Sequence, residues 1–172
     1  MEYKKFKDAD KIINRSDYMV AKPEENKNKW SQVFGNNNPI HLELGMGRGD
    51  FIINMAASNP RVNFIGLEIS EDQLVKAVQK LNNKQLPNLK LICADARSID
   101  TFFGREINTI YLTFSEPWPK AHDEKKRFTH ESYLRLYDKI FRKDKHIIMT
   151  DWEKKCVQDR KPIYYVDASF KG

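Results

Sequence analysis

Apolar residues along the chain alternate between two spacings, and the first is typical of strands. Five short runs are rich in β-branched and aromatic residues: PIHLEL (39–44), NFIGLEI (63–69), NLKLICA (88–94), TIYLTF (109–114) and HIIMT (146–150). Continuous apolar runs of this length are typical of strands that are buried on both faces of a parallel sheet. The pattern therefore predicts five parallel strands.

The segments between these runs carry apolar residues at helical spacing. Three apolar faces are indicated: Phe51, Ile52, Met55 and Ala56, ended by Asn59-Pro60; Leu74, Val78 and Leu81; and Tyr133, Tyr137, Ile140 and Phe141. Repeated alternation of strand and helix is the pattern of a doubly wound α/β fold with a mostly parallel sheet. We expect that fold class for the main part of the chain.

Residues 22–38, KPEENKNKWSQVFGNNN, interrupt this alternation. They are rich in Asn, Lys and Glu and show no sustained period, which favours a connector. We therefore predict a basic N-terminal arm and connector over residues 1–38, followed by one domain over residues 39–172. A total of 172 residues is the size of one domain with a substantial core.

The charge distribution favours a polyanionic partner. The net charge is +6 and the sequence pI is about 9.2. Residues 1–29 hold 8 basic and 6 acidic residues, and residues 120–145 hold 9 and 5, whereas residues 39–119 are almost balanced, with 8 and 9. Positive charge on both sides of a neutral body suits nucleic acid or phospholipid. A solvated, lysine-rich surface explains the same charge equally well.

Several classes of protein are disfavoured by what the sequence lacks. No apolar run approaches the length of a membrane span, and the N-terminus has no apolar signal-peptide core, so we expect a cytoplasmic protein with no membrane partner. Cys93 and Cys156 are far apart, and the four histidines are scattered without zinc-ligand spacing. We expect neither a disulfide nor a metal site.

A glycine-rich stretch, ELGMGRGD, follows the first predicted strand. Gly45, Gly47 and Gly49 occupy alternate positions, where glycine allows a positive φ and lets a ligand approach the backbone. In open α/β sheets, ligands bind beyond the carboxyl ends of the strands. The third glycine comes one residue too early for the dinucleotide fingerprint, and no Gly-Lys-Ser/Thr follows as in a P-loop. The stretch predicts a ligand loop without fixing the ligand.

Three acidic residues at successive strand ends narrow the choice of ligand. Glu68 is placed to accept both hydroxyls of a ribose, and Asp95 is placed beside an adenine. Glu43, just before the glycine loop, would repel a pyrophosphate but would suit an ammonium and a sulfonium. This favours S-adenosylmethionine over a nicotinamide dinucleotide. Taken singly, Glu43 could instead bond the loop amides, and Glu68 could be a surface residue.

One further stretch is more specific than the glycine loop: YLTFSEPWPKAHDEKKRFTHESYL, residues 111–134. It fixes an acid between a strand and a Pro-Trp-Pro turn, and basic residues follow at once. Together with ELGMGRGDFI, NFIGLEIS and NLKLICADA, it resembles the bacterial tRNA (guanine-N7)-methyltransferases over residues 40–151. The resemblance implies the Rossmann-like fold of class I S-adenosylmethionine-dependent methyltransferases, and methyl transfer to a guanine N7 in tRNA, in the variable loop.

The resemblance also implies roles for individual residues. Cofactor positions are matched by Glu43, Gly45, Gly47, Glu68, Asp95 and Glu116, and Glu116 is also matched to the catalytic acid. Substrate positions are matched by Lys120, Thr150, Asp151 and Glu153. The cofactor would be S-adenosyl-L-methionine, the product S-adenosyl-L-homocysteine and the partner tRNA, with no metal.

The implied chemistry agrees with these residue types. Guanine N7 already presents a lone pair, so methyl transfer needs no general base and depends on positioning. A fixed carboxylate such as Glu116 stabilises the positive charge that moves onto the purine. Trp118 offers a face for stacking. For Lys125, Lys126 and Arg127, phosphate binding and a solvated helix start are equally good interpretations.

Two departures from the family pattern keep alternatives open. The family has Asp where this chain has Glu116, a change that moves the carboxylate by ~1.5 Å. After residue 146 the sequence corresponds to a shortened member, with a helix and a strand missing and PIYYVDA as a sixth, antiparallel edge strand. Apolar surface left uncovered would suit a homodimer, which a monomer by light scattering would refute. A noncatalytic tRNA-binding relative and a methyltransferase for a small molecule or protein remain alternatives.

Overall fold

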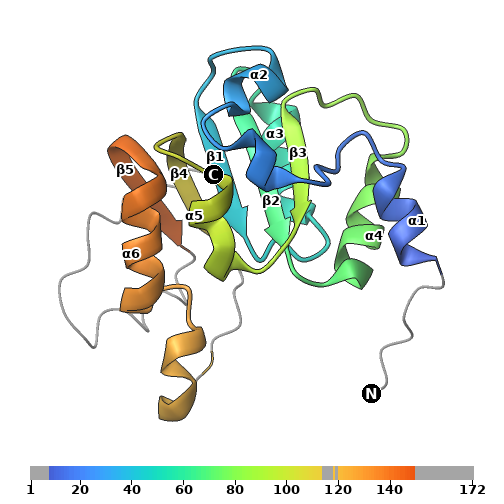
Figure 1. The fold of residues 1–172 in the computed structure, drawn as a ribbon. Helices are drawn as coiled ribbons and strands as arrows, with labels where there is room; N and C mark the ends of the chain where they lie inside the picture. The colour runs from blue at the N-terminus through green and yellow to red at the C-terminus, as the bar shows by residue number, and fades with distance from the viewer. Residues whose placement is uncertain (1–7, 114–117, 119, 150–172) are drawn as a thin grey trace.

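A parallel five-stranded sheet forms the centre of the protein. The computed structural model describes residues 8–113, 118 and 120–149. The strands are β1 (Ile40–Leu44), β2 (Asn63–Glu68), β3 (Leu89–Cys93), β4 (Ile107–Leu112) and β5 (Phe141–Met149), in the spatial order β3-β2-β1-β4-β5 (Figure 1). The predicted doubly wound parallel sheet is confirmed. The predicted sixth strand, PIYYVDA, lies outside the described residues.

The strand order places a switch point beside β1. From β1 the chain adds β2 and then β3 on one side, and it later returns to place β4 and β5 on the other side. All four strand pairs are parallel, for example with Glu43 opposite both Gly66 and Tyr111. The carboxyl ends of the strands therefore lie along one edge of the sheet, where open α/β sheets bind ligands.

Helices cover both faces of the sheet and make three layers. On one face lie α1 (Ala9–Asn14), α3 (Asp50–Ser58) and α4 (Glu71–Leu81), and on the other α2 (Trp30–Phe34), α5 (Ile99–Phe102) and α6 (Glu131–Ile140). Short 3₁₀ turns are η1 (Pro23–Asn26), η2 (Ala96–Ser98) and η3 (Ala121–Lys126). Across the described ranges, no helix combines the length and hydropathy of a membrane-spanning segment.

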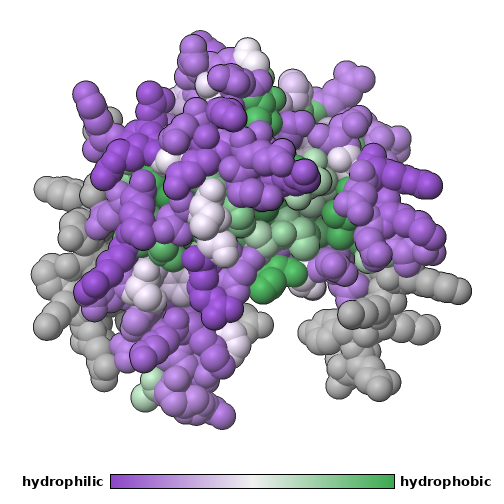
Figure 2. All heavy atoms as spheres, viewed as in Figure 1, coloured by the Kyte–Doolittle hydropathy of each residue, from purple (hydrophilic) through white to green (hydrophobic). Residues whose placement is uncertain are grey.

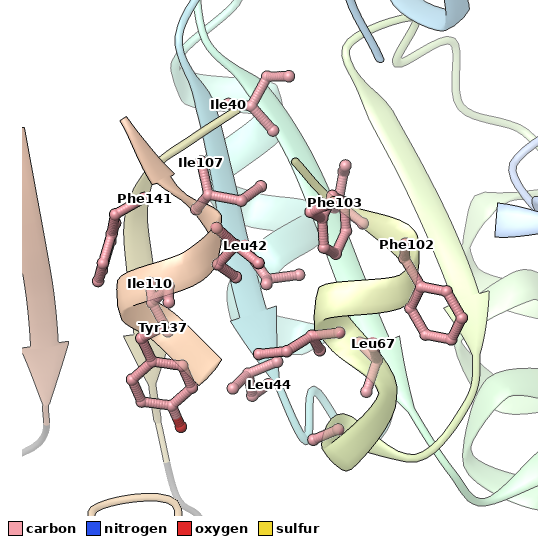
Figure 3. Packing of buried hydrophobic residues seen from close by; sticks show 14 of the residues in the cluster. Ile40, Leu42, Leu44, Leu67, Phe102, Phe103, Ile107, Ile110, Tyr137 and Phe141 are labelled. Carbon is pink, nitrogen blue, oxygen red and sulfur yellow. The ribbon is translucent and has the colours of Figure 1, made fainter. Parts of the chain in front are cut away.

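The apolar periodicity accounts for which side chains the helices bury. Residues of α4 that were predicted to face the core, Leu74, Val78 and Leu81, are buried. In α3 the buried face is made by Ile52, Ile53 and Ala56, whereas Phe51 and Met55 are only partly buried. Under α5 and α6, Leu42, Leu44 and Ile110 of the sheet gather with Phe103 and Tyr137 of the helical layer (Figure 3). Hydrophilic residues cover most of the face of the described part that Figure 2 shows.

The boundary between α6 and β5 differs from the sequence prediction. Phe141 was assigned to a helical face, but the helix ends at Ile140 and Phe141 begins the strand, paired with Ile107. Its side chain is 2% exposed. Both elements bury an apolar residue at this point, so the pattern alone could not separate them. The register between β4 and β5 then shifts between Ile107 and Thr109.

The segment before β1 packs against the domain. The indole of Trp30 is 0% exposed, and its Nε1 donates a hydrogen bond to the Phe102 carbonyl at 2.9 Å. The carboxylate of Glu106 accepts hydrogen bonds from the backbone amides of Asn28 and Trp30, at 2.8 and 3.1 Å. Farther upstream, Ile13 of α1 is buried in the cluster that includes α4. The division of the chain at residue 38 stays a prediction.

Candidate functional site

A cavity of about 1030 Å³ opens at the carboxyl ends of β1, β2 and β3. This is the size of pockets that hold small ligands and cofactors. Its lining residues come from the glycine loop, from the ends of β2 and β3, and from the segment between Trp118 and Tyr133. The cavity therefore lies where the sequence placed its unusual residues, beside the switch point of the sheet.

The glycine loop adopts the conformation that its glycines allow. Gly45 and Gly47 line the cavity and have φ of 67° and 55°. The Gly45 amide donates a hydrogen bond to the Leu67 carbonyl at 2.9 Å, which ties the loop to β2. A Cβ at Gly45 would lie 3.1 Å from the ring of Phe128. Glycine is needed at this position both for its backbone angle and for the close approach of the ring.

Glu68 joins the end of β2 to the glycine loop. Its Oε2 accepts a hydrogen bond from the Gly47 amide, and its Oε1 accepts one from the Ser70 amide, each at 2.9 Å. From the sequence, Glu43 was one candidate to accept hydrogen bonds from the loop amides. In the structure, Glu68 accepts the hydrogen bond from the Gly47 amide. Each carboxylate oxygen has a second lone pair. Because Glu68 also lines the cavity, it can accept ligand hydroxyls while it holds the loop.

Glu43 lies beneath this loop and is enclosed by protein. It is 1% exposed, and its Oε1 accepts a hydrogen bond from the hydroxyl of Thr113 at the end of β4. Its Oε2 has no hydrogen-bond partner among the described residues. The pKa of Glu43 is raised to about 8, mainly by burial; the hydrogen bond from Thr113 opposes this rise, and the nearby Glu68 carboxylate contributes to it. A cation beside Oε2 would satisfy this oxygen.

Asp95 lines the cavity at the end of β3. It is the N-cap of η2, and its Oδ1 accepts a hydrogen bond from the Arg97 amide at 2.8 Å. The Arg97 guanidinium also binds the carboxylate and holds the pKa of Asp95 below its usual range. Ile69, which follows Glu68 in the chain, also lines the cavity; it is 64% exposed and offers an apolar surface to a flat ring.

One part of the cavity lining is aromatic and basic. Trp118, Lys125, Lys126, Phe128 and Tyr133 line it, and the rings of Phe128 and Tyr133 meet edge to face with centroids 5.2 Å apart. The segment that follows the Pro-Trp-Pro turn is thus brought against the glycine loop.

Two of the basic residues in this segment are held within the protein. Lys126 Nζ lies 2.7 Å from a carboxylate oxygen of Asp123 and 4.5 Å from the centre of the Trp118 ring. Arg127 Nε donates a hydrogen bond to the Trp118 carbonyl at 2.9 Å, at a residue whose φ is 41°. In contrast, Lys120 and Lys125 are exposed, and their ammonium groups form no ion pair with the described residues. Neither interpretation of the basic stretch included these contacts of Lys126 and Arg127, and phosphate binding stays a prediction.

The remaining predicted site residues are not all in the described part of the chain. Glu116, Thr150, Asp151 and Glu153 lie outside the described residues. The structure brings Gly45, Gly47, Glu68 and Asp95 together around the cavity, with Glu43 behind it. Within the described ranges, no group of three or more His, Cys, Asp or Glu side chains is placed to hold a metal ion.

Sequence reasoning missed three residues of the site. Phe128 and Tyr133 line the cavity, although from the sequence Phe128 was given no role and Tyr133 was assigned only to an apolar helical face. For Thr113 the sequence gives a weak indication of a role in the site, because a polar residue stands inside the apolar run TIYLTF, at the end of the strand. Its partner on β1 could not be identified without the strand order.

Comparison with known proteins places the chain in a family. Residues 37–163 match the model of a family described as "Putative methyltransferase". The chain belongs to this family. It is 46% identical over 132 residues to the tRNA (guanine-N(7)-)-methyltransferase of Geobacillus sp. (strain WCH70), covering 76% of this chain and 60% of that protein. It is 48% identical over 130 residues to the protein of the same name from Streptococcus mutans serotype c, covering 75% and 62%.

The chain thus spans about three-fifths of the length of these relatives. Solved structures of methyltransferases share its fold at low identity. An antibiotic-related methyltransferase has a TM-score of 0.59 at 19% identity, over 70% of this chain and 61% of that one. The 16S rRNA methyltransferase KamB has a TM-score of 0.54 at 18% identity, over 67% and 53%. The fold is therefore the Rossmann-like fold of class I methyltransferases.

Proposed function

We propose that this protein transfers a methyl group from S-adenosylmethionine to N7 of a guanine in tRNA. The observation that carries the proposal is the cavity at the ends of β1, β2 and β3, which joins a glycine loop and two acids to an aromatic, basic wall. The names of its relatives support tRNA as the substrate and guanine N7 as the acceptor. The variable loop as the position of that guanine is part of the same proposal.

The residues of the cavity fit the parts of this cofactor. Glu68 would accept hydrogen bonds from the ribose hydroxyls, and Asp95 would accept one from the adenine amino group beside the exposed Ile69. Gly45 and Gly47 would let the methionine part pass close to the backbone. The unpaired, buried Oε2 of Glu43 fits a positively charged group. When bound, the cofactor supplies a methyl group activated by a sulfonium.

The residues of the Pro-Trp-Pro segment would position the acceptor base. Guanine N7 needs no deprotonation, so the contribution of the protein is alignment and stabilisation of charge. We assign to Glu116 the role of accepting hydrogen bonds from guanine and stabilising the positive charge that develops on it. Thr150, Asp151 and Glu153 would bind the substrate with it.

The RNA backbone would be bound by the exposed lysines. Lys120 and Lys125 have ammonium groups that the described protein does not pair, whereas Lys126 and Arg127 hold the Trp118 segment. Phosphate contacts give affinity that does not depend on sequence and that falls with salt. One face of Trp118 is covered by Lys126, so stacking with a base would use the other face.

A noncatalytic tRNA-binding protein is the second candidate, favoured by the glutamate at position 116. One experiment separates the two. Purified protein is incubated with labelled S-adenosylmethionine and unmodified bulk tRNA, and the digested RNA is analysed for 7-methylguanosine. Glu116→Ala and Glu116→Asp are assayed in parallel.

We expect 7-methylguanosine with the wild type and with Glu116→Asp, and its loss with Glu116→Ala. Product that survives Glu116→Ala would keep the reaction and remove Glu116 from its centre. Label in a different nucleoside would refute guanine N7 as the acceptor. Absence of label, with cofactor and tRNA binding intact, would establish the noncatalytic candidate.

A further inference from the structure

The contact between Thr113 and Glu43 crosses from one strand to its neighbour at the edge of the sheet that binds ligands. Both side chains are buried, at 6% and 1% exposure, and the Thr113 hydroxyl donates its hydrogen bond to Oε1 of Glu43. The two residues are 70 positions apart in the chain. They meet only because β4 lies directly beside β1 in the sheet.

This hydrogen bond makes the two oxygens of Glu43 unequal. Oε1 is held by Thr113, and Oε2 is left without a hydrogen-bond partner among the described residues. A buried polar atom without a partner costs free energy, and native proteins rarely keep one without a reason. The cavity lies close by, because its lining residues Gly45 and Leu67 are near neighbours of Glu43 and of its cross-strand partner Gly66.

Few other groups act on this carboxyl. From β2 the Glu68 carboxylate disfavours its ionisation, and from α3 the Ile52 amide favours it. From β4 comes the phenol of Tyr111, whose pKa is raised to about 12 by burial and, to a smaller extent, by Glu43, and Thr113 follows directly after that strand. None of these groups is a cation. In the empty protein the carboxyl is therefore held mainly in its neutral form at pH 7, since burial raises its pKa to about 8.

We propose that Thr113 is a positioning residue for ligand binding. It fixes Oε1 of Glu43 and leaves Oε2 as the acceptor for the cofactor's ammonium group. Glu43 releases its proton as that cation binds. The inference rests on the proposed function, because it takes S-adenosylmethionine as the ligand. Protons and charge balance in this step. The carboxylic acid loses one proton to solvent, and the resulting carboxylate pairs with the ammonium of the bound cofactor.

The experiment is titration calorimetry of the full chain with S-adenosylhomocysteine in two buffers that differ in ionisation enthalpy. The difference between the observed heats gives the number of protons released. Thr113→Val removes the hydroxyl at nearly constant volume, and Thr113→Ser keeps it. Methylthioadenosine, which has the adenosine and the thioether but no amino-acid group, is the matched control ligand.

We expect the wild type to release close to one proton per S-adenosylhomocysteine at pH 7, since a group with a pKa of about 8 is about nine-tenths protonated there. Thr113→Val should weaken S-adenosylhomocysteine binding by roughly tenfold. It should leave methylthioadenosine binding unchanged, which also shows that the variant is folded. Thr113→Ser should behave as the wild type, and Glu43→Gln should release no proton.

Two results would overturn the inference while the proposed function stands: binding of S-adenosylhomocysteine without proton release, or equal losses of both ligands in Thr113→Val. A wild type that binds neither S-adenosylhomocysteine nor S-adenosylmethionine would instead refute the proposed function itself. The two failures are therefore distinguishable in one set of titrations.

Discussion

The carboxylate of Glu68, at the end of β2, accepts a hydrogen bond at 2.9 Å from the backbone amide of Gly47 in the loop after β1. Its second oxygen accepts one from Ser70, at the start of α4. One acid thus connects the first two strand ends and the helix between β2 and β3. The shape of the glycine loop and the placement of a ligand acceptor depend on the same side chain.

Glu68→Ala should therefore affect both stability and binding. Two amides in a partly enclosed site lose their acceptor, so we expect the free energy of unfolding in urea to fall by about 1–3 kcal/mol. S-adenosylhomocysteine affinity should fall more than stability alone explains, because the proposed acceptor of the ribose hydroxyls is lost too. Glu71→Ala, an exposed change close by in sequence, is the control. Weakened binding with unchanged stability would show that the loop does not need Glu68.

Gly45 and Gly35 form a matched pair for testing the close approach of Phe128. Both have a positive φ, at 67° and 69°, but only at Gly45 would a Cβ meet another residue within 4 Å. An alanine at either position should cost about 1 kcal/mol in backbone strain. Gly45→Ala should cost more and should displace Phe128 from the cavity wall, lowering cofactor affinity. Equal costs, with no effect on binding, would show that the ring moves away freely.

His41 should make the stability of the protein depend on pH in the acid range. Burial, with a smaller effect of His146, lowers the pKa of His41 to about 4, and its Nδ1 lies 2.9 Å from the Tyr111 hydroxyl. In the unfolded chain its pKa is about 6.5. The unfolded state therefore binds more protons between pH 4 and 6.5, and stability is present above this range and lost as the pH falls through it.

The measurement is the free energy of unfolding at several pH values for the wild type and His41→Gln. The wild type should lose up to about 3 kcal/mol more than the variant between pH 6.5 and 4. Parallel curves for the wild type and His41→Gln would contradict a lowered pKa for the partly buried His41.

Neighbouring lysines in the segment after the Pro-Trp-Pro turn should have different effects on tRNA binding. Lys125→Ala should weaken binding and reduce the slope of log affinity against log salt by about 1, without a change in melting temperature. Lys126→Ala should also lower the melting temperature slightly, because it removes the contacts to Asp123 and Trp118. Identical salt slopes for Lys125→Ala and the wild type would exclude a phosphate contact at Lys125.

The sequence by itself determined the five parallel strands, most of the core helices and the edge of the sheet at which the site lies. The spacing and number of apolar residues in a segment indicate how deeply it is buried. In a parallel sheet the carboxyl ends of the strands lie at one edge, where ligands bind. The glycine loop and the acids Glu68 and Asp95 were predictable for that reason, since each follows a strand closely.

Only the tertiary structure decided which side chains meet. Glu68 rather than Glu43 holds the glycine loop, Thr113 reaches Glu43 across the sheet, Phe128 approaches Gly45, and Trp30 enters the core from a segment without periodicity. Each contact joins residues far apart in sequence. Local patterns report how deeply a residue is buried and in which element it lies, but the strand order and the side-chain rotamers select its partner.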